Sequence, residues 1–253
     1  MANWSDPRTG AAYAATDVRA EAHDAGLRAY MLSVYNYMLS GVLLTGIVAL
    51  VFAKTSLINL LFTVQETARG LAISPSLLGW VVMLSPLAIV LSMSFLQERL
   101  SESALKALFF LYAGLLGASL STIFLTYTDM SIAQVFFGTA AGFAALSVYG
   151  YTTKKDLSGF GTFLIMGLIG LIVASIVNVF LQSGTMSLVI SVIGVLIFAG
   201  LTAYDTQKIK SIYAHVAGTD MVGKVVIMGA LNLYLDFINM FLFLLRLFGS
   251  ARD

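Results

Sequence analysis

The chain has 253 residues, of which 59% are hydrophobic and 11% are charged, and its mean hydropathy is +0.91. A typical soluble domain carries about 25% charged residues, and a compact core cannot hide this much apolar surface while so few charges cover the outside. These values exclude a water-soluble globular enzyme, a nucleic-acid binder and a disordered chain, and they predict a polytopic membrane protein. The net charge of +1 implies no acidic partner, and the chain has no cysteine for thiol chemistry or metal binding.

Residues 1–28 form a polar segment of mixed charge ahead of the first apolar run. The segment is too polar and too long to be the charged start of a signal peptide, and no convincing cleavage site follows it. We expect a flexible tail or a short surface helix. The predicted organisation is therefore a tail at 1–28, a membrane domain at 29–250 and a short C-terminal end at 251–253.

Runs without Asp, Glu, Lys or Arg mark the membrane-spanning segments. The longest run, 157–204, has 48 residues, and as one helix it would be about 72 Å long against a hydrocarbon core of about 30 Å. It must turn once, and the polar sequence at 182–185 marks the turn. The runs are apolar on every face rather than alternating as barrel strands do, so we predict an all-α fold. The seven expected transmembrane helices are Leu32–Phe52, Leu77–Phe95, Leu105–Leu125, Ile132–Tyr149, Phe160–Leu181, Met186–Tyr204 and Val225–Leu245.

Lysine and arginine in the loops predict the orientation of these helices, because cytoplasmic loops carry an excess of both. With the N-terminus inside, the inner segments hold ten basic residues and the outer segments hold four. The sequence thus favours a cytoplasmic N-terminus and an external C-terminus. Residues 54–76 and 206–224 are the sizeable segments expected to lie outside the membrane.

Asp236 is the clearest ionisable residue at membrane depth, about ten residues from either end of the last span. A carboxylate there costs about 2.5–3.5 kcal/mol on insertion scales, so it should have a specific role. Asn232 and Asn239 lie four residues before and three residues after it, which places all three on one helix face. Such a stripe lines either a polar pathway or a hydrogen-bonded packing seam. The seam explains the two asparagines, but it does not require an acid.

Asp205 is a second candidate acid, at the predicted inner end of the sixth helix. It is either a boundary residue near Lys208 or a partner of Asp236. Two carboxylates close together in a low dielectric would share one proton or hold a hard cation such as Ca²⁺ transiently. Arg99 could grip such a pair, or it could anchor the inner end of the second helix. Asp205 lies about 18 residues from the outer turn and Asp236 lies about 10 from Arg246. The two acids therefore differ in depth by about 10 Å, so their pairing is a hypothesis.

Three blocks of sequence resemble the Bax inhibitor-1 family, also called the transmembrane Bax inhibitor motif family, in its bacterial branch. They span 153–164, 203–210 and 231–246, within a similarity that covers about residues 29–250. The resemblance implies six helices around a central seventh, in the bacterial inner membrane, and a calcium leak gated by pH. It also implies that Asp205 and Asp236 form the pH sensor and that Arg99 tethers them.

Three classes of function follow from these patterns. The first is a passive cation pathway, for Ca²⁺, without a resident cofactor. The second is a regulator that inhibits a membrane protease or a death effector, since one bacterial subgroup of the family is associated with a membrane-bound AAA protease. The third is an intramembrane aspartyl protease. Bulky residues at 233–235 precede Asp236 where those proteases have Gly-x-Gly, so we expect no enzymatic activity and no catalytic residue.

Overall fold

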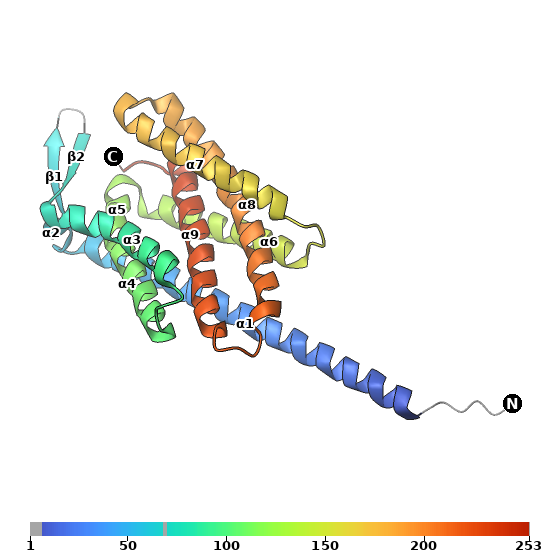
Figure 1. Cartoon of the computed structure of the whole chain (residues 1–253). Coiled ribbons are helices and arrows are strands. Elements are labelled where there is room, and N and C mark those ends of the chain that lie inside the picture. The colour runs from blue at the N-terminus through green and yellow to red at the C-terminus, as the bar shows by residue number, and fades with distance from the viewer. Residues whose placement is uncertain (1–6, 68–69, 253) are drawn as a thin grey trace.

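The computed structural model describes residues 7–67 and 70–252, with side chains described for 23–63 and 74–252. Within these ranges the chain is helical apart from one short hairpin (Figure 1). Seven helices are long and apolar enough to cross a membrane, which confirms the predicted all-α polytopic fold. The elements are α1 (Pro7–Lys54), α2 (Ile58–Leu61), β1 (Phe62–Thr67), β2 (Gly70–Pro75), α3 (Leu77–Leu96), α4 (Glu102–Leu120), α5 (Ile123–Thr126), α6 (Asp129–Thr152), α7 (Ser158–Leu181), α8 (Gly184–Val216) and α9 (Val222–Phe248).

The turn that divides the long uncharged run lies where the sequence predicts it. α7 ends at Gln182, whose φ of 48° is left-handed and stops the helix. Ser183 then caps α8, because its Oγ accepts a hydrogen bond from the backbone N–H of Met186 at 3.3 Å. The same device, a serine or threonine side chain that accepts from the third residue of the helix, begins three more helices. These caps are Ser76, Ser101 and Thr128.

Two segments differ from the sequence prediction because the helices are longer than their apolar parts. α8 continues to Val216, so most of the predicted loop 206–224 is helical and the connection to α9 spans only 217–221. α1 begins at Pro7, so residues 7–28 of the segment assigned to a tail are continuous with the first span, and residues 1–6 of that segment lie outside the described residues (Figure 1). Hydropathy marks where a helix enters lipid, and a helix that extends beyond the membrane gives no such signal.

The segment between α1 and α3 contains a hairpin that the sequence analysis does not foresee. β1 and β2 pair antiparallel, from Phe62 opposite Pro75 to Thr67 opposite Gly70. The backbone N–H of Ser76 donates to the carbonyl oxygen of Leu61 at 2.8 Å, which ties the base of the hairpin to α2. The hairpin lies at the end of the bundle that also holds the C-terminus (Figure 1).

Polar contacts fix the C-terminal residues to that same end. Asp129 pairs with Lys54 at 2.7 Å and with Arg252 at 3.2 Å. The backbone N–H of Arg252 also donates to the carbonyl oxygen of Thr126 at 2.9 Å. These contacts join the end of α1, the start of α6 and the C-terminal segment.

α9 is the most buried helix of the bundle. In the apolar 18-residue stretch of α9, 67% of the residues are buried, against 11–44% in the corresponding stretches of the other six spans. It packs mainly against α1, α4, α6 and α8, whereas α3 packs on α4 and α7 packs on α8 (Figure 1). The expected arrangement of six helices around a seventh is therefore not confirmed: four helices line α9, and α3 and α7 form an outer layer.

Glycines allow close helix contact at some positions and not at others. A Cβ on Gly150 would meet the backbone of Ala203, so α6 and α8 approach closely there. Gly138 and Gly142, the sequence's GxxxG pair, are exposed and have no described atom within 4 Å of the place a Cβ would take. GxxxG spacing is typical of close helix contact, but here the pair faces no neighbouring helix among the described residues.

We expect Gly150→Ala to destabilise the bundle. The added methyl group would force the backbones of α6 and α8 apart, and overpacking of this kind costs about 1–3 kcal/mol, or about 2–12 °C in melting temperature for a chain of this size. Gly142→Ala, eight residues earlier on the same helix, is the matched control and should melt at or slightly above the wild-type temperature. Equal melting temperatures of the two variants in detergent would contradict the close contact.

Candidate functional site

Asp236 lies near the middle of α9 and is 4% exposed. Of the side chains that the structure describes, it is the single charged residue in the buried set, which otherwise contains only serine and threonine among polar residues. Its Oδ2 atom has no hydrogen-bond partner among the described residues. A buried polar atom without a partner is costly and uncommon in native proteins, so this oxygen marks a site where a proton or an ion can act.

Asp205 on α8 meets Asp236. The two carboxyl groups are close enough to interact directly. A hydrogen bond between two carboxyl groups forms only when one of them carries a proton. The structure therefore brings together the two acids that the sequence analysis singled out, in an arrangement that can hold one shared proton or one cation.

The length of α8 explains why the expected difference in depth disappears. α8 and α9 are antiparallel helices joined by the turn at 217–221. Asp205 lies 12 residues before this turn and Asp236 lies 15 residues after it. Three residues correspond to about 4.5 Å along a helix, which side-chain reach and helix tilt can span. The 10 Å estimate is wrong because it counts both acids from the outer ends of their helices, whereas the turn at 217–221 sets the register of α8 and α9.

Arg99 does not join the two acids in this structure. It is exposed, in the turn between α3 and α4, and no ion pair involves it among the described residues. Lys208, one turn after Asp205 on the same helix, is instead the cation whose charge acts on Asp205. The bridge from Arg99 that the sequence resemblance implies is therefore absent from this conformation.

Asn232 and Asn239 are both half-buried on α9. The side-chain amide of Asn239 donates to the carbonyl oxygen of Leu235 at 2.8 Å, one turn earlier in its own helix. This bond stays within α9, so it does not show Asn239 in a hydrogen-bonded seam with another helix. That either asparagine lines an ion pathway stays a prediction.

A hydroxyl network that the sequence analysis missed holds the opposite face of α9. The Tyr234 hydroxyl lies 2.6 Å from Thr45 Oγ1 on α1, and Thr45 donates to the carbonyl oxygen of Ala113 on α4 at 2.9 Å. Since Thr45 uses its one hydrogen on Ala113, Tyr234 must be the donor to Thr45. A fully buried tyrosine needs such a partner, and Tyr234 next to the acid-bearing stretch is the sequence signal that could have revealed it.

A second network fixes α8 beside the acid pair. The Thr206 hydroxyl, next to Asp205, donates to Ser147 on α6 at 3.4 Å. Gln207 holds the loop between α6 and α7 through two hydrogen bonds. Its Oε1 accepts from the backbone N–H of Leu157 at 2.9 Å, and its Nε2 donates to the carbonyl oxygen of Lys155 at 2.8 Å. The residues that flank Asp205 are thus anchored to α6 and to the loop after it.

Comparisons with known proteins agree with this architecture. A family model described as "Inhibitor of apoptosis-promoting Bax1" matches residues 27–253. The chain belongs to the Bax inhibitor-1 family. The resemblance carried by the three sequence blocks is therefore confirmed.

The Bax inhibitor-1 relatives are bacterial and match over nearly their whole length. The "Uncharacterized protein RP147" of Rickettsia prowazekii is 47% identical over 91% of this chain and 93% of its own. The "Inner membrane protein YbhL" of Escherichia coli strain K12 is 46% identical over 90% of this chain and 94% of its own. The "Uncharacterized membrane protein SpyM3_0260" of Streptococcus pyogenes is 38% identical over 89% of this chain and 94% of its own. The chain is therefore a membrane protein related to a bacterial inner membrane protein.

We expect Thr45→Val to destabilise the protein more than Tyr234→Phe does. The valine would leave both the Tyr234 hydroxyl and the Ala113 carbonyl without this partner, whereas the phenylalanine would remove one bond and leave Thr45 bonded to Ala113. Hydrogen bonds between membrane helices contribute about 0.6 kcal/mol on average and at most about 1.7. Thermal unfolding in detergent would measure the order. A larger loss for Tyr234→Phe would contradict the assignment of Tyr234 as donor.

Proposed function

We propose that this Bax inhibitor-1 protein is a passive pathway for Ca²⁺ across the membrane, gated by Asp205 and Asp236, and that it is not an enzyme. The observation that supports this function best is the unpartnered Oδ2 of Asp236, at mid-helix in the most buried span and facing a second carboxyl group. Ionisable residues at this depth mark ion and proton pathways. A purely structural contact between helices would not need two acids.

The chemistry of the pair supports a transient cation site rather than a resident one. Calcium takes six to eight oxygen ligands in a stable site, whereas two carboxylates offer at most four oxygens. Within the described residues, no third His, Cys, Asp or Glu joins them. A cation at the pair would keep part of its water shell, bind weakly and leave again, as a permeating ion must. We therefore assign the protein no cofactor, and Ca²⁺ is its cargo.

The burial of Asp236 makes this conformation the closed one in the proposed cycle. With Asp236 4% exposed, the shared proton holds α8 and α9 together through one carboxyl–carboxyl hydrogen bond. Loss of that proton places two negative charges side by side, which repel each other and attract a cation. The gate proposed here uses the two aspartates and the nearby charge of Lys208, without a tether from Arg99.

The proposed orientation places the N-terminus in the cytoplasm and the C-terminus outside. Seven spans put the start of α1 and the C-terminal segment at opposite ends of the bundle (Figure 1). The connection α6–α7 and the end of α8 carry Lys154, Lys155, Lys208 and Lys210 at one end. An excess of basic residues favours the cytoplasmic side for that end.

We expect Asp236→Asn and Asp205→Asn each to reduce calcium flux at neutral pH by at least about tenfold, which corresponds to about 1.4 kcal/mol of lost ion interaction. Each change removes one charge and keeps the shape of the side chain. Flux would be measured in reconstituted vesicles that contain a trapped calcium dye. Asp156→Asn, at an exposed acid in the α6–α7 loop, is the matched control and should leave the flux unchanged. Wild-type flux in both site variants would overturn the proposal.

We also expect calcium flux through the wild type to change with pH and flux through Asp236→Asn to lose this dependence. Protons and Ca²⁺ compete for the same carboxylate oxygens, so metal occupancy depends on pH. An asparagine cannot take up or release the proton. The measurement is the initial flux at a fixed calcium gradient from pH 5 to pH 8. The same pH profile in wild type and variant would show that another group is the sensor.

A regulatory protein that binds and inhibits a membrane protease or a death effector is the second candidate. The observation that favours it is the N-terminal part of α1, which projects beyond the helical bundle and offers a surface for a partner (Figure 1). A membrane-bound AAA protease is the partner proposed from the family resemblance.

Deletion of residues 1–22 separates the two functions. A calcium pathway through the bundle should retain at least half of the wild-type flux after the deletion, because the span at 23–54 remains. A regulator that binds through this segment should lose co-purification with its partner. Loss of flux together with retained partner binding would reverse the assignment.

A further inference from the structure

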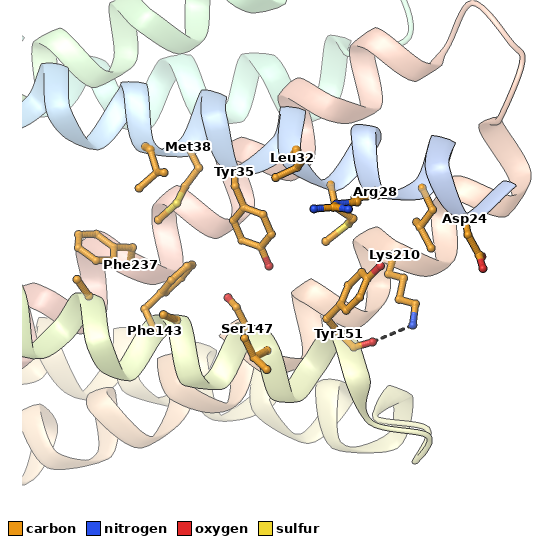
Figure 2. A pocket seen from close by; sticks show the side chains of 16 residues that line it. Asp24, Arg28, Leu32, Tyr35, Met38, Phe143, Ser147, Tyr151, Lys210 and Phe237 are labelled. Atoms are coloured by element: carbon orange, nitrogen blue, oxygen red, sulfur yellow. Dashed lines mark hydrogen bonds between the residues drawn. The ribbon is translucent and has the colours of Figure 1, made fainter. Parts of the chain in front are cut away.

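A large crevice separates α1 from α6. Its volume is about 840 Å³, within the range of sites that bind small molecules. Figure 2 shows Tyr35 and Met38 on α1 pointing across the space toward Phe143 and Ser147 on α6. Neither Asp205 nor Asp236 lines it.

The crevice opens toward the lipid. Leu32, Leu39 and Val148 lie on its walls and are 52%, 58% and 63% exposed. Its floor is Phe237 of α9, which is buried. An apolar groove at membrane depth, open at the side, is in contact with hydrocarbon chains rather than with water. The occupant must therefore come from the bilayer or from another membrane helix.

One end of the crevice is charged. Arg28 on α1 and Lys210 on α8 lie at this end, together with the single carboxylate of Asp24 (Figure 2). The Lys210 ammonium donates to the carbonyl oxygen of Tyr151 at 2.8 Å, which positions it and leaves two further hydrogens to donate. Two cations against one carboxylate favour an anionic group, and both cations suit the oxygens of a phosphate.

The length of the crevice matches one leaflet of a bilayer. Eleven residues separate Arg28 at the charged end from Leu39 at the apolar end. This distance corresponds to about 16 Å along a helix, and half of a hydrocarbon core is about 15 Å. A second helix, about 10–12 Å wide with its side chains, would need a broader groove with small residues on both walls. Tyr35, Met38 and Phe143 are bulky and fit a single chain better.

We propose that this crevice binds an anionic phospholipid, with the phosphate at Arg28 and Lys210 and one acyl chain between α1 and α6 down to Phe237. The site is distinct from the aspartate pair, and its test does not depend on calcium transport. The lipid belongs to the leaflet at the end of the bundle where the basic residues gather.

Native mass spectrometry of the full chain in detergent tests the proposal, with added palmitoyl-oleoyl phosphatidylglycerol or the corresponding phosphatidylcholine. Ala144 lines the crevice, whereas the next residue, Ala145, is exposed and lies outside its lining. We expect Ala144→Trp to fill the groove and to reduce the fraction of chains that carry phosphatidylglycerol at least fivefold. Ala145→Trp should stay within twofold of the wild type. Equal effects of the two variants would overturn the site.

A second pair of variants tests the phosphate contact. We expect the double variant Arg28→Gln/Lys210→Gln to lower the preference for phosphatidylglycerol over phosphatidylcholine to about one. Lys154→Gln/Lys155→Gln removes the same charge from the loop after α6 and should leave the preference unchanged. Loss of the preference in this control pair instead would assign the headgroup to the loop and overturn the proposal.

Ala140→Phe, at another lining position, replaces Ala144→Trp if that variant does not fold.

Discussion

The contact between Asp236 and Asp205 constrains the rest of the bundle, because a carboxyl group cannot stay at the centre of a lipid-embedded protein without a partner. α9 is the most buried span, so the acid it carries can meet only residues from the helices that line it. The partner that it meets lies on α8, the helix directly before α9. The short turn at 217–221 sets the register of these two helices and thereby the meeting of the two acids.

The sequence predicts the membrane spans well because lipid imposes a simple rule on composition. Charged residues are excluded from the hydrocarbon core, so the uncharged runs mark the spans, and the run of 48 residues must turn where Gln182 and Ser183 stop one helix and start the next. Beyond the lipid the rule no longer applies. Residues 205–216 are polar enough for a loop and are helical in the structure, and the hairpin at 62–75 depends on backbone pairing that apolar runs do not reveal.

The sequence likewise reveals the composition of the candidate site but not its geometry. An acid at membrane depth is visible in the sequence, so both Asp205 and Asp236 could be found there. The partner of an acid depends on helix length and rotation, which is why Asp205 meets Asp236 while Arg99, a cation that is also near a helix end, lies exposed in its turn. The Gly138–Gly142 pair shows the same limit: spacing identifies a small face and does not say which neighbour covers it.

Tyr234 and Asp236 hold two opposite faces of α9. Successive residues of a helix are about 100° apart, so residues two apart point about 200° from each other. Tyr234 accordingly bonds to Thr45 on α1, while Asp236 faces Asp205 on α8. The contact with α1 is made by neutral hydroxyl groups, which do not titrate near neutral pH. In the proposed cycle, loss of the shared proton therefore loosens the α8 side of α9 and leaves the α1 side in place.

This asymmetry also determines which helices move. α7 packs on α8 rather than on α9, so α7 would follow α8 in the proposed movement, while α1 and α4 remain attached to α9 through Thr45. The lipid crevice lies between α1 and α6, with the end of α8 at one wall, and its floor is Phe237, the residue after Asp236. The ring of Phe237 packs edge-on against Phe136 and Phe143 of α6 at 5.5 Å. An acyl chain lodged beside Phe237 would add contacts to α9 and α6. The helix that carries the acid would therefore also contact the bilayer.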